Sequence, residues 1–177
     1  STMLNYILPY EIWEDGPLAA RAKMADPLVG RRVIDAVDAY RRDLDQLRLA
    51  WVHGNNRPDQ LGMTLQQIVE ESGKSAADAL LDLLIGANLA VLCVVDEGDD
   101  TPVEPLMQHP RGMIGTDGIY QPGGHVHPRV YGSSGRLLGE LVRDKKLMSL
   151  AEAVHKMTGL PAWRFGLTGR GEIKADN

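Results

Sequence analysis

Residues 112–118 have the sequence Gly-Met-Ile-Gly-Thr-Asp-Gly, and this stretch decides how the fold is interpreted. Its small and apolar residues up to Thr116 predict a short buried strand, with Asp117 at the carboxyl end of that strand. Barrel enzymes carry their catalytic side chains at this end of their strands. Asp117 is therefore a candidate general base, or a carboxylate beside a metal-bound water. In the alternative interpretation, Asp117 only caps the following turn by bonding to nearby backbone.

A loop rich in glycine and proline follows to about residue 132, and it holds the next candidates, His125-Val-His127 and Arg129. Zinc hydrolases use such an H-x-H pair on a strand, but prolines flank this one and no acidic residue or cysteine nearby completes a tetrahedral site. We therefore expect packed or substrate-facing histidines, with His127 as a candidate for substrate binding. The planar guanidinium of Arg129 suits bidentate recognition of a carboxylate, although an arginine in a loop can also be merely solvated.

Helix signals surround this segment on both sides. An Asp-Pro pair at residues 26–27 predicts a helix with an apolar stripe to about residue 47. Capping patterns at Thr64, Ser75 and Ser149 predict three further helices. Leu47–Val52 predicts a short strand, and the apolar run Leu89–Val95 predicts a strand buried on both faces of a parallel or mixed sheet. The turn-forming residues 53–58 predict a loop, in which Arg57 is a further candidate for ligand contact.

The composition narrows the class of protein. The chain has 177 residues, 44% of them hydrophobic, and a net charge of -5, which suits one folded domain and disfavours nonspecific binding to nucleic acid. The single cysteine, Cys93, excludes an internal disulfide and is expected to be a buried, inert thiol. No apolar run is long enough for a transmembrane helix. Only two or three strands are predicted, and a complete (β/α)₈ barrel needs about 250 residues, so we expect a part of something larger.

Six spaced motifs occur in an order that resembles the N-acyl-D-amino-acid deacylase (D-aminoacylase) family of the amidohydrolase superfamily. They are Met113-Ile-Gly-Thr-Asp-Gly118, His127-Pro-Arg-Val-Tyr-Gly132, Ser149-Leu-Ala-Glu-Ala-Val154, Lys156-Met-Thr-Gly-Leu-Pro-Ala162, Arg164-Phe-Gly-Leu167 and Arg170-Gly171. Weaker agreement continues upstream and includes Asn56-Arg57. Thr116 departs from the pattern, because the family typically has serine before the aspartate.

The resemblance implies a fold and a division into parts. The implied fold class is α/β but predominantly helical, comprising the last strands and helices of an amidohydrolase (TIM-like) barrel. Residues 3–63 would be an inserted helical subdomain and loop, and residues 64–177 the C-terminal barrel segment with its last catalytic strand at 112–117. The family's N-terminal metal-binding H-x-H and terminal β-domain have no counterpart here, so we expect a fragment that is inactive in isolation.

The resemblance also implies a chemistry. The family uses zinc to hydrolyse the amide bond of N-acyl-D-amino acids, and Asp117 matches its proton-transferring aspartate, which can also lie beside the metal. Arg129 matches the arginine expected to pair with the substrate's α-carboxylate. No tight zinc binding is expected from this chain alone, because a zinc site needs at least three protein ligands. The other expectations are a small-molecule substrate, no nucleic-acid or membrane partner, self-association of the fragment and a cytoplasmic location.

Two alternatives stay open at the level of sequence. One is a non-catalytic helical module that acts by binding or as a structural part. The other is a different amidohydrolase, similar to dihydroorotase or hydantoinase, against which the run from His127 to Gly132 argues. The side chain of the substrate and the number of metal ions are not determined by these motifs.

Overall fold

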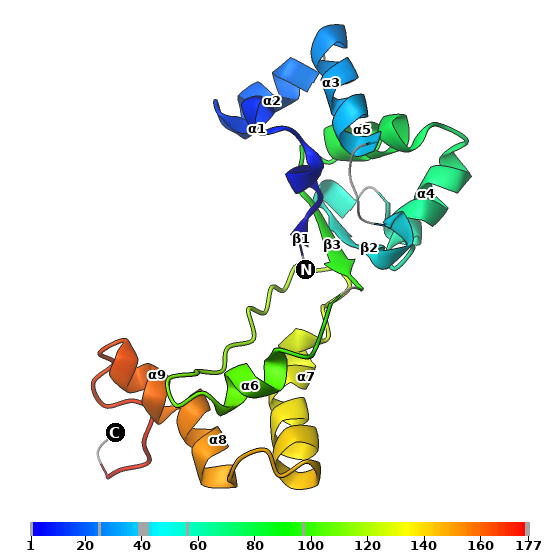
Figure 1. The fold of residues 1–177 in the computed structure, drawn as a ribbon. Helices are drawn as coiled ribbons and strands as arrows, with labels where there is room; N and C mark the ends of the chain where they lie inside the picture. The colour runs from blue at the N-terminus through cyan, green and yellow to red at the C-terminus, as the bar shows by residue number, and fades with distance from the viewer. Residues whose placement is uncertain (1, 25, 39–42, 56, 97, 176–177) are drawn as a thin grey trace. The chain divides into compact units, whose positions relative to one another are not determined.

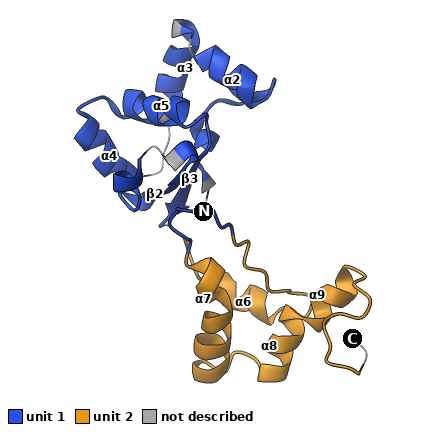
Figure 2. Ribbon diagram, turned by 180° about the vertical axis from the view of Figure 1, so that it is seen from behind, with its two compact units in different colours: residues 1–97, 119–127 blue, residues 98–118, 128–177 orange. Residues whose placement is uncertain are grey.

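The computed structural model describes residues 2–24, 26–38, 43–55, 57–96 and 98–175. The chain divides into two compact units (Figure 2). Unit 1 contains residues 1–97 and 119–127, and unit 2 contains residues 98–118 and 128–177. The boundary that the sequence predicted after residue 63 therefore falls inside unit 1. Within the described residues, no helix is both long enough and apolar enough to cross a membrane.

Unit 1 is built around a three-stranded sheet (Figure 1). Its strands are β1 (Thr2–Met3), β2 (Leu47–Val52) and β3 (Val91–Val95), in the order β1-β3-β2. Both pairs are antiparallel, so the expected parallel or mixed sheet is wrong for this unit. Two parallel neighbouring strands are usually joined by a crossover connection that contains one helix. Here two helices separate β2 from β3, and the chain enters β3 from the opposite end.

The described part of unit 1 also contains five α-helices, and each contributes residues to one core with the sheet. They are α1 (Tyr10–Trp13), α2 (Pro17–Met24), α3 (Pro27–Asp38), α4 (Leu65–Ser72) and α5 (Ala76–Gly86). Helix α5 contacts both α3 and α4, and its leucines join β2 and β3 in one aliphatic core. The helix predicted to continue to about residue 47 ends at Asp38 as described, and residues 39–42 lie outside the described part. Leu47 begins β2 instead.

The predicted start of α4 is confirmed by its hydrogen bonds. The Thr64 hydroxyl accepts a bond from the Gln67 backbone N–H at 3.2 Å, and the Gln67 side chain accepts one from the Thr64 N–H at 2.9 Å. Ser75 caps α5 in the same way, by accepting from the Asp78 N–H. These contacts form between near neighbours, and a local sequence pattern was therefore enough to predict them.

Unit 2 is helical. Its elements are α6 (Val103–Gln108), α7 (Arg129–Arg136), the π-helical turn η5 (Leu137–Asp144), α8 (Leu150–Met157) and α9 (Gly159–Arg164). A small core forms where Leu137 and Leu141 of η5 meet Met148 and Ala153. The loop predicted to reach residue 132 ends earlier, since α7 already begins at Arg129. Pro128 stands at its N-cap with φ -50°, a value that suits a helix start.

The segment predicted as the last catalytic strand, residues 112–117, is extended but forms no strand in the structure. Residues 109–128, which are all described, contain no strand. A strand requires a neighbouring strand for its hydrogen bonds, and this segment instead lies against a helix. The Ile114 N–H donates to the Lys156 carbonyl oxygen at 3.1 Å, near the end of α8. The backbone that leads to Asp117 is thus held by α8.

Candidate active site

Asp117 occupies a backbone conformation that is rare for residues other than glycine. Its φ is +46°, in the left-handed region where aspartate and asparagine are enriched. Such conformations concentrate in turns and functional sites. The Thr116 hydroxyl accepts a hydrogen bond from the Gly118 N–H at 3.2 Å. Thr116 thereby makes the local turn contact that the alternative interpretation assigned to Asp117, and the Asp117 carboxylate is directed elsewhere.

The Asp117 carboxylate pairs with Arg129. Oδ2 of Asp117 lies 2.8 Å from Nη2 of Arg129, and both residues belong to unit 2. The Arg129 side chain is 21% exposed, whereas that of Asp117 is 83% exposed. Arg129 is the first residue of α7, and the Ser133 hydroxyl donates to its carbonyl oxygen at 2.7 Å. The half-buried guanidinium of Arg129 thus pairs with an Asp117 carboxylate that faces solvent.

Gly118 allows the turn to approach α7 closely. A Cβ atom at this position would lie 3.2 Å from both the Val130 side chain and the Thr116 hydroxyl. That distance is at the tight end of ordinary contacts, so a larger residue would displace one of these neighbours. Both residues of the Asp-Gly pair therefore suit this turn: the aspartate tolerates its left-handed conformation, and the glycine leaves Val130 and Thr116 in place.

The other candidate residues lie in unit 1. His125 N–H donates to the Ala50 carbonyl oxygen at 2.7 Å, and its ring lies against Gly62. His127 is half-buried. Neither histidine belongs to the unit that holds Asp117. Across the described residues, no group of three or more histidine, cysteine, aspartate or glutamate side chains is arranged to hold a metal ion. The roles of His127 and Arg57 in substrate binding stay predictions.

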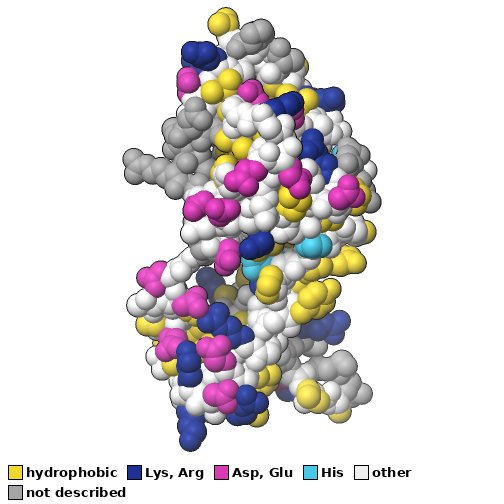
Figure 3. Space-filling model, turned by 90° about the vertical axis from the view of Figure 1, so that its right-hand side faces the viewer, with side chains coloured by type: hydrophobic (Ala, Val, Ile, Leu, Met, Phe, Trp, Pro, Cys, Tyr) yellow, Lys and Arg dark blue, Asp and Glu magenta, His cyan; other side chains and the backbone are white. Residues whose placement is uncertain are grey.

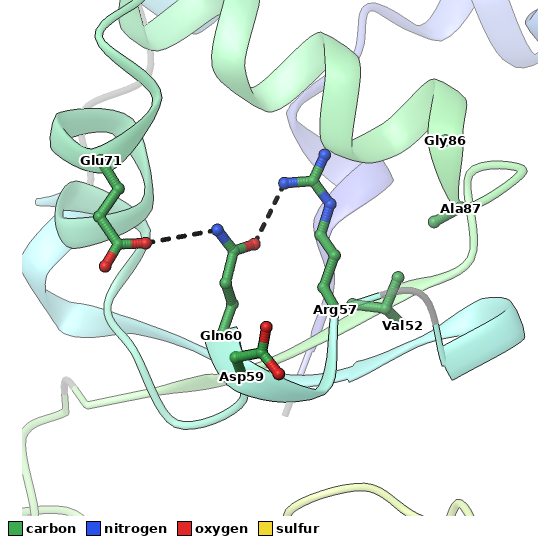
Figure 4. A pocket seen from close by; sticks show the side chains of 7 residues that line it. All are labelled: Val52, Arg57, Asp59, Gln60, Glu71, Gly86 and Ala87. Atoms are coloured by element: carbon green, nitrogen blue, oxygen red, sulfur yellow. Dashed lines mark hydrogen bonds between the residues drawn. The ribbon is translucent and has the colours of Figure 1, made fainter.

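Arg57 lines a polar cavity of about 660 Å³ in unit 1 (Figure 4). Its guanidinium donates to the Gln60 side chain at 3.1 Å, and the Gln60 amide in turn donates to Glu71 at 3.5 Å. Figure 4 shows Gln60 between the other two side chains. Asp59 also lines the cavity. Two acidic side chains therefore accompany Arg57, and the cavity offers mixed charge rather than a purely cationic surface.

Cys93 lies in the middle strand of the sheet and is fully buried. Burial raises the pKa of its thiol to about 12. A thiol reacts as its thiolate, so Cys93 is protonated and inert near neutral pH. The burial predicted for this thiol from the sequence is confirmed.

Lys156 was not among the candidate residues predicted from the sequence. This residue of α8 is only 2% exposed, and Nζ donates to the carbonyl oxygens of His109 at 2.5 Å and Gly112 at 3.4 Å. Lysine is among the residues that are rarely buried. A signal was present, because Lys156 follows Ala153 by three residues and thus shares the inward face of the helix.

Comparison with known proteins places the chain in a family. The pattern of the amidohydrolase family matches residues 23–177, and the chain therefore belongs to that family. It is 36% identical to an N-acyl-D-glutamate deacylase of Alcaligenes xylosoxydans xylosoxydans over 130 residues, covering 73% of this chain and 25% of the relative. It is 39% identical to a D-aminoacylase of the same organism over 118 residues, covering 67% and 23%.

A solved structure gives the same result. The chain resembles the N-acyl-D-glutamate deacylase of Bordetella bronchiseptica, which was solved with zinc and a phosphonate inhibitor that mimics the tetrahedral intermediate. The TM-score is 0.63 at 33% identity, over 75% of this chain and 26% of that one. The chain thus spans about a quarter of the length of the relatives that it matches. The resemblance inferred from the six motifs is confirmed.

Proposed function

We propose that this chain is part of an amidohydrolase that hydrolyses the amide bond of N-acyl-D-amino acids. The observation that carries the proposal is the Asp117–Arg129 pair, which joins a carboxylate and a guanidinium at 2.8 Å on two of the motifs matched to the family. The related proteins named above support it, since both curated relatives are deacylases of D-amino-acid derivatives. The substrate class is accordingly a small acylated amino acid with an α-carboxylate.

Each residue of the pair has a distinct role in this proposal. Asp117 removes a proton from the attacking water, whose oxygen bonds to the amide carbonyl carbon. It then delivers that proton to the amine nitrogen as the carbon–nitrogen bond breaks, so that a carboxylic acid and a free amino acid result. Arg129 binds the α-carboxylate and fixes the orientation of the amide relative to Asp117. The high exposure of the Asp117 carboxylate fits a group that must meet water and substrate.

The described residues do not fit a zinc site, although a solved relative contains zinc. The carboxylate to which we assign the proton transfer, that of Asp117, pairs with the Arg129 guanidinium and not with other side chains that bind metals. We therefore propose that zinc belongs to the complete enzyme and takes most of its ligands from other parts of that enzyme, with Asp117 supplying at most one of them. The steps assigned to Asp117 and Arg129 concern only proton transfer and orientation.

We also propose how the two parts of the chain relate to a barrel. Residues 112–117 would be the last catalytic strand of a TIM-like barrel once neighbouring strands supply hydrogen bonds, with residues 64–177 as its C-terminal segment. Residues 3–63 would form an inserted helical subdomain. Residues 112–116 lead into Asp117 without forming a helix, and this path with Asp117 at its end supports the assignment.

The test of the proposed function is a chiral activity assay. The complete natural polypeptide is incubated with N-acetyl-D-amino acids that carry acidic and aliphatic side chains, and release of the free amino acid is measured. The matched control is the L enantiomer of each substrate. We expect release from D substrates and little from L substrates. Equal rates on both enantiomers, or hydrolysis of cyclic amides alone, would contradict the proposal.

A further inference from the structure

Lys156 holds the backbone that leads to the candidate catalytic aspartate. Its Nζ donates to the carbonyl oxygens of His109 and Gly112, and its own carbonyl oxygen accepts from the Ile114 N–H at 3.1 Å. One residue of α8 therefore binds three positions within residues 109–114, and all of these contacts lie within unit 2.

The segment is packed tightly at this point. A Cβ atom on Gly112 would lie 2.7 Å from the Leu106 carbonyl oxygen and 3.0 Å from that of His109. Gly112 N–H also donates to the His109 carbonyl oxygen at 2.8 Å, so this oxygen accepts from both the backbone and Lys156. The turn between α6 and the extended segment is therefore fixed by the lysine ammonium at its centre.

Stability alone is a poor reason to bury an ammonium here. Removing a charge from water is costly, and apolar residues of similar size often stabilise a protein core at least as well as a buried charge. An ammonium has three N–H donors, which a methionine or leucine lacks, and it can thus set the directions of several carbonyl groups at once. The chemistry of Lys156 suits fixing a backbone path more than filling space.

The path in question ends at Asp117. Asp117 follows Ile114 by three residues, and no strand pairing holds the residues between them. Its carboxylate has the ion pair with Arg129, while its backbone depends on the segment behind it. We propose that Lys156 is a positioning residue, which acts through the backbone of residues 109–114 to place Asp117 opposite Arg129. This assignment rests on the proposed function for its catalytic consequence.

Hydrogen exchange tests the structural part of the proposal in the complete natural polypeptide. Lys156→Met removes the ammonium and keeps most of the apolar stem, and Lys146→Met makes the same change at an exposed position. We expect the Gly112 and Ile114 amides to exchange about tenfold to a hundredfold faster in Lys156→Met, as for loss of a hydrogen bond to a charged group. The Ala153 and Leu147 amides should keep their rates. Equal acceleration of all four amides, or no acceleration of the first two, would overturn the proposal.

Kinetics test the catalytic part with the same variants. Lys156→Met should lower kcat by about tenfold to a hundredfold with little change in KM, because a misplaced general base loses rate without losing substrate binding. Adding Lys156→Met to Asp117→Asn should lower kcat no further. Full kcat in Lys156→Met, or effects that multiply, would contradict positioning through Asp117. A normal kcat in Asp117→Asn would show that the proposed function is wrong. In that case the exchange rates alone would test whether Lys156 positions the backbone of residues 109–114.

Discussion

Asp117 and Arg129 form an ion pair at 2.8 Å that connects a left-handed turn to the first residue of helix α7. The two residues are twelve positions apart, and the nine residues 119–127 between them belong to the other unit. The chain thus leaves unit 2 after Gly118 and re-enters it at Pro128, and the pair joins the two ends of this excursion. A carboxylate and a guanidinium brought together in this way can act on one substrate.

Arg129→Lys should weaken substrate binding more than turnover. The ammonium keeps the positive charge but loses the planar fork that matches a carboxylate. We expect KM for an N-acetyl-D-amino acid to rise clearly, with a smaller fall in kcat from poorer orientation of the amide. Steady-state kinetics over a range of substrate concentrations measure the two effects. Arg143→Lys, at an exposed position of unit 2, is the matched control and should behave as the natural protein. An unchanged KM in Arg129→Lys would rule out the proposed contact.

Cys93 should make the stability of the protein depend on alkaline pH. The folded pKa of about 12 exceeds the value of about 8.5 for an unfolded thiol. The unfolded chain therefore releases this proton first, and the free energy of unfolding falls as pH rises from about 8.5 toward 12. Below pH of about 8.5 the buried thiol makes its full contribution to the free energy of unfolding. Denaturation at several pH values measures it, and Cys93→Ala should lack this part of the fall.

The reactivity of the same thiol supplies a second readout of its burial. Native Cys93 should resist a disulfide-exchange reagent at pH 8 and react only after denaturation. A Ser134→Cys variant, exposed on α7, should react rapidly under the same conditions. Rapid labelling of native Cys93 would mean that β3 is open to solvent.

Ser149→Ala should destabilise unit 2 by about 1 kcal/mol, the typical cost of losing a helix cap. The Ser149 hydroxyl accepts from the Glu152 N–H at 3.1 Å, and the substitution leaves that N–H without its partner. Ser134→Ala makes the same change inside α7 and should have little effect. Chemical denaturation followed by circular dichroism compares the two variants. Equal stability in both would show that the cap contributes nothing.

The isolated chain should self-associate through exposed apolar side chains. Unpaired strand edges at Leu89–Val95 do not support this prediction, because β3 is the middle strand with a neighbour on each side. Exposed aromatic residues carry the prediction instead, since Trp163 and Phe165 are 77% and 70% exposed. The face in Figure 3 shows hydrophobic side chains gathered in several places among charged ones. Exposed apolar side chains that lie together favour association.

Sedimentation velocity over a range of concentrations measures this association. The double variant Trp163→Gln and Phe165→Gln should shift the distribution toward monomer. Leu28→Gln, which changes an exposed leucine of α3, should not. A monomer at every concentration in the natural sequence would be inconsistent with the prediction.

Local features of the fold were predictable from the sequence, and pairings between distant residues were not. The caps at Thr64, Ser75 and Ser149 form within one helical turn, and short patterns reveal them. The first residues of helix α7, 129–132, were predicted as loop because they follow a stretch rich in glycine and proline. The antiparallel order of the sheet also depends on contacts that no local pattern contains.

The same distinction between local patterns and distant contacts holds for the candidate site. Asp117 and Arg129 could be named from motifs, but their contact and the left-handed turn appear only in the structure. Lys156 was overlooked because a lysine in a helix is usually solvated, and only its carbonyl partners show why it is buried. His127 and Arg57 were grouped with the others by sequence, whereas both belong to unit 1.

The most direct measurement of the central claim is the kcat of Asp117→Asn in the complete polypeptide. Asparagine tolerates the left-handed conformation as well as aspartate does, and an exposed ion pair contributes within about 1 kcal/mol, so the variant should fold normally. We predict that kcat on N-acetyl-D-amino acids falls by about 10²–10⁴-fold with little change in KM, as expected for loss of proton transfer. A folded variant with near-normal kcat would contradict the account, because Asp117 would then serve only the turn.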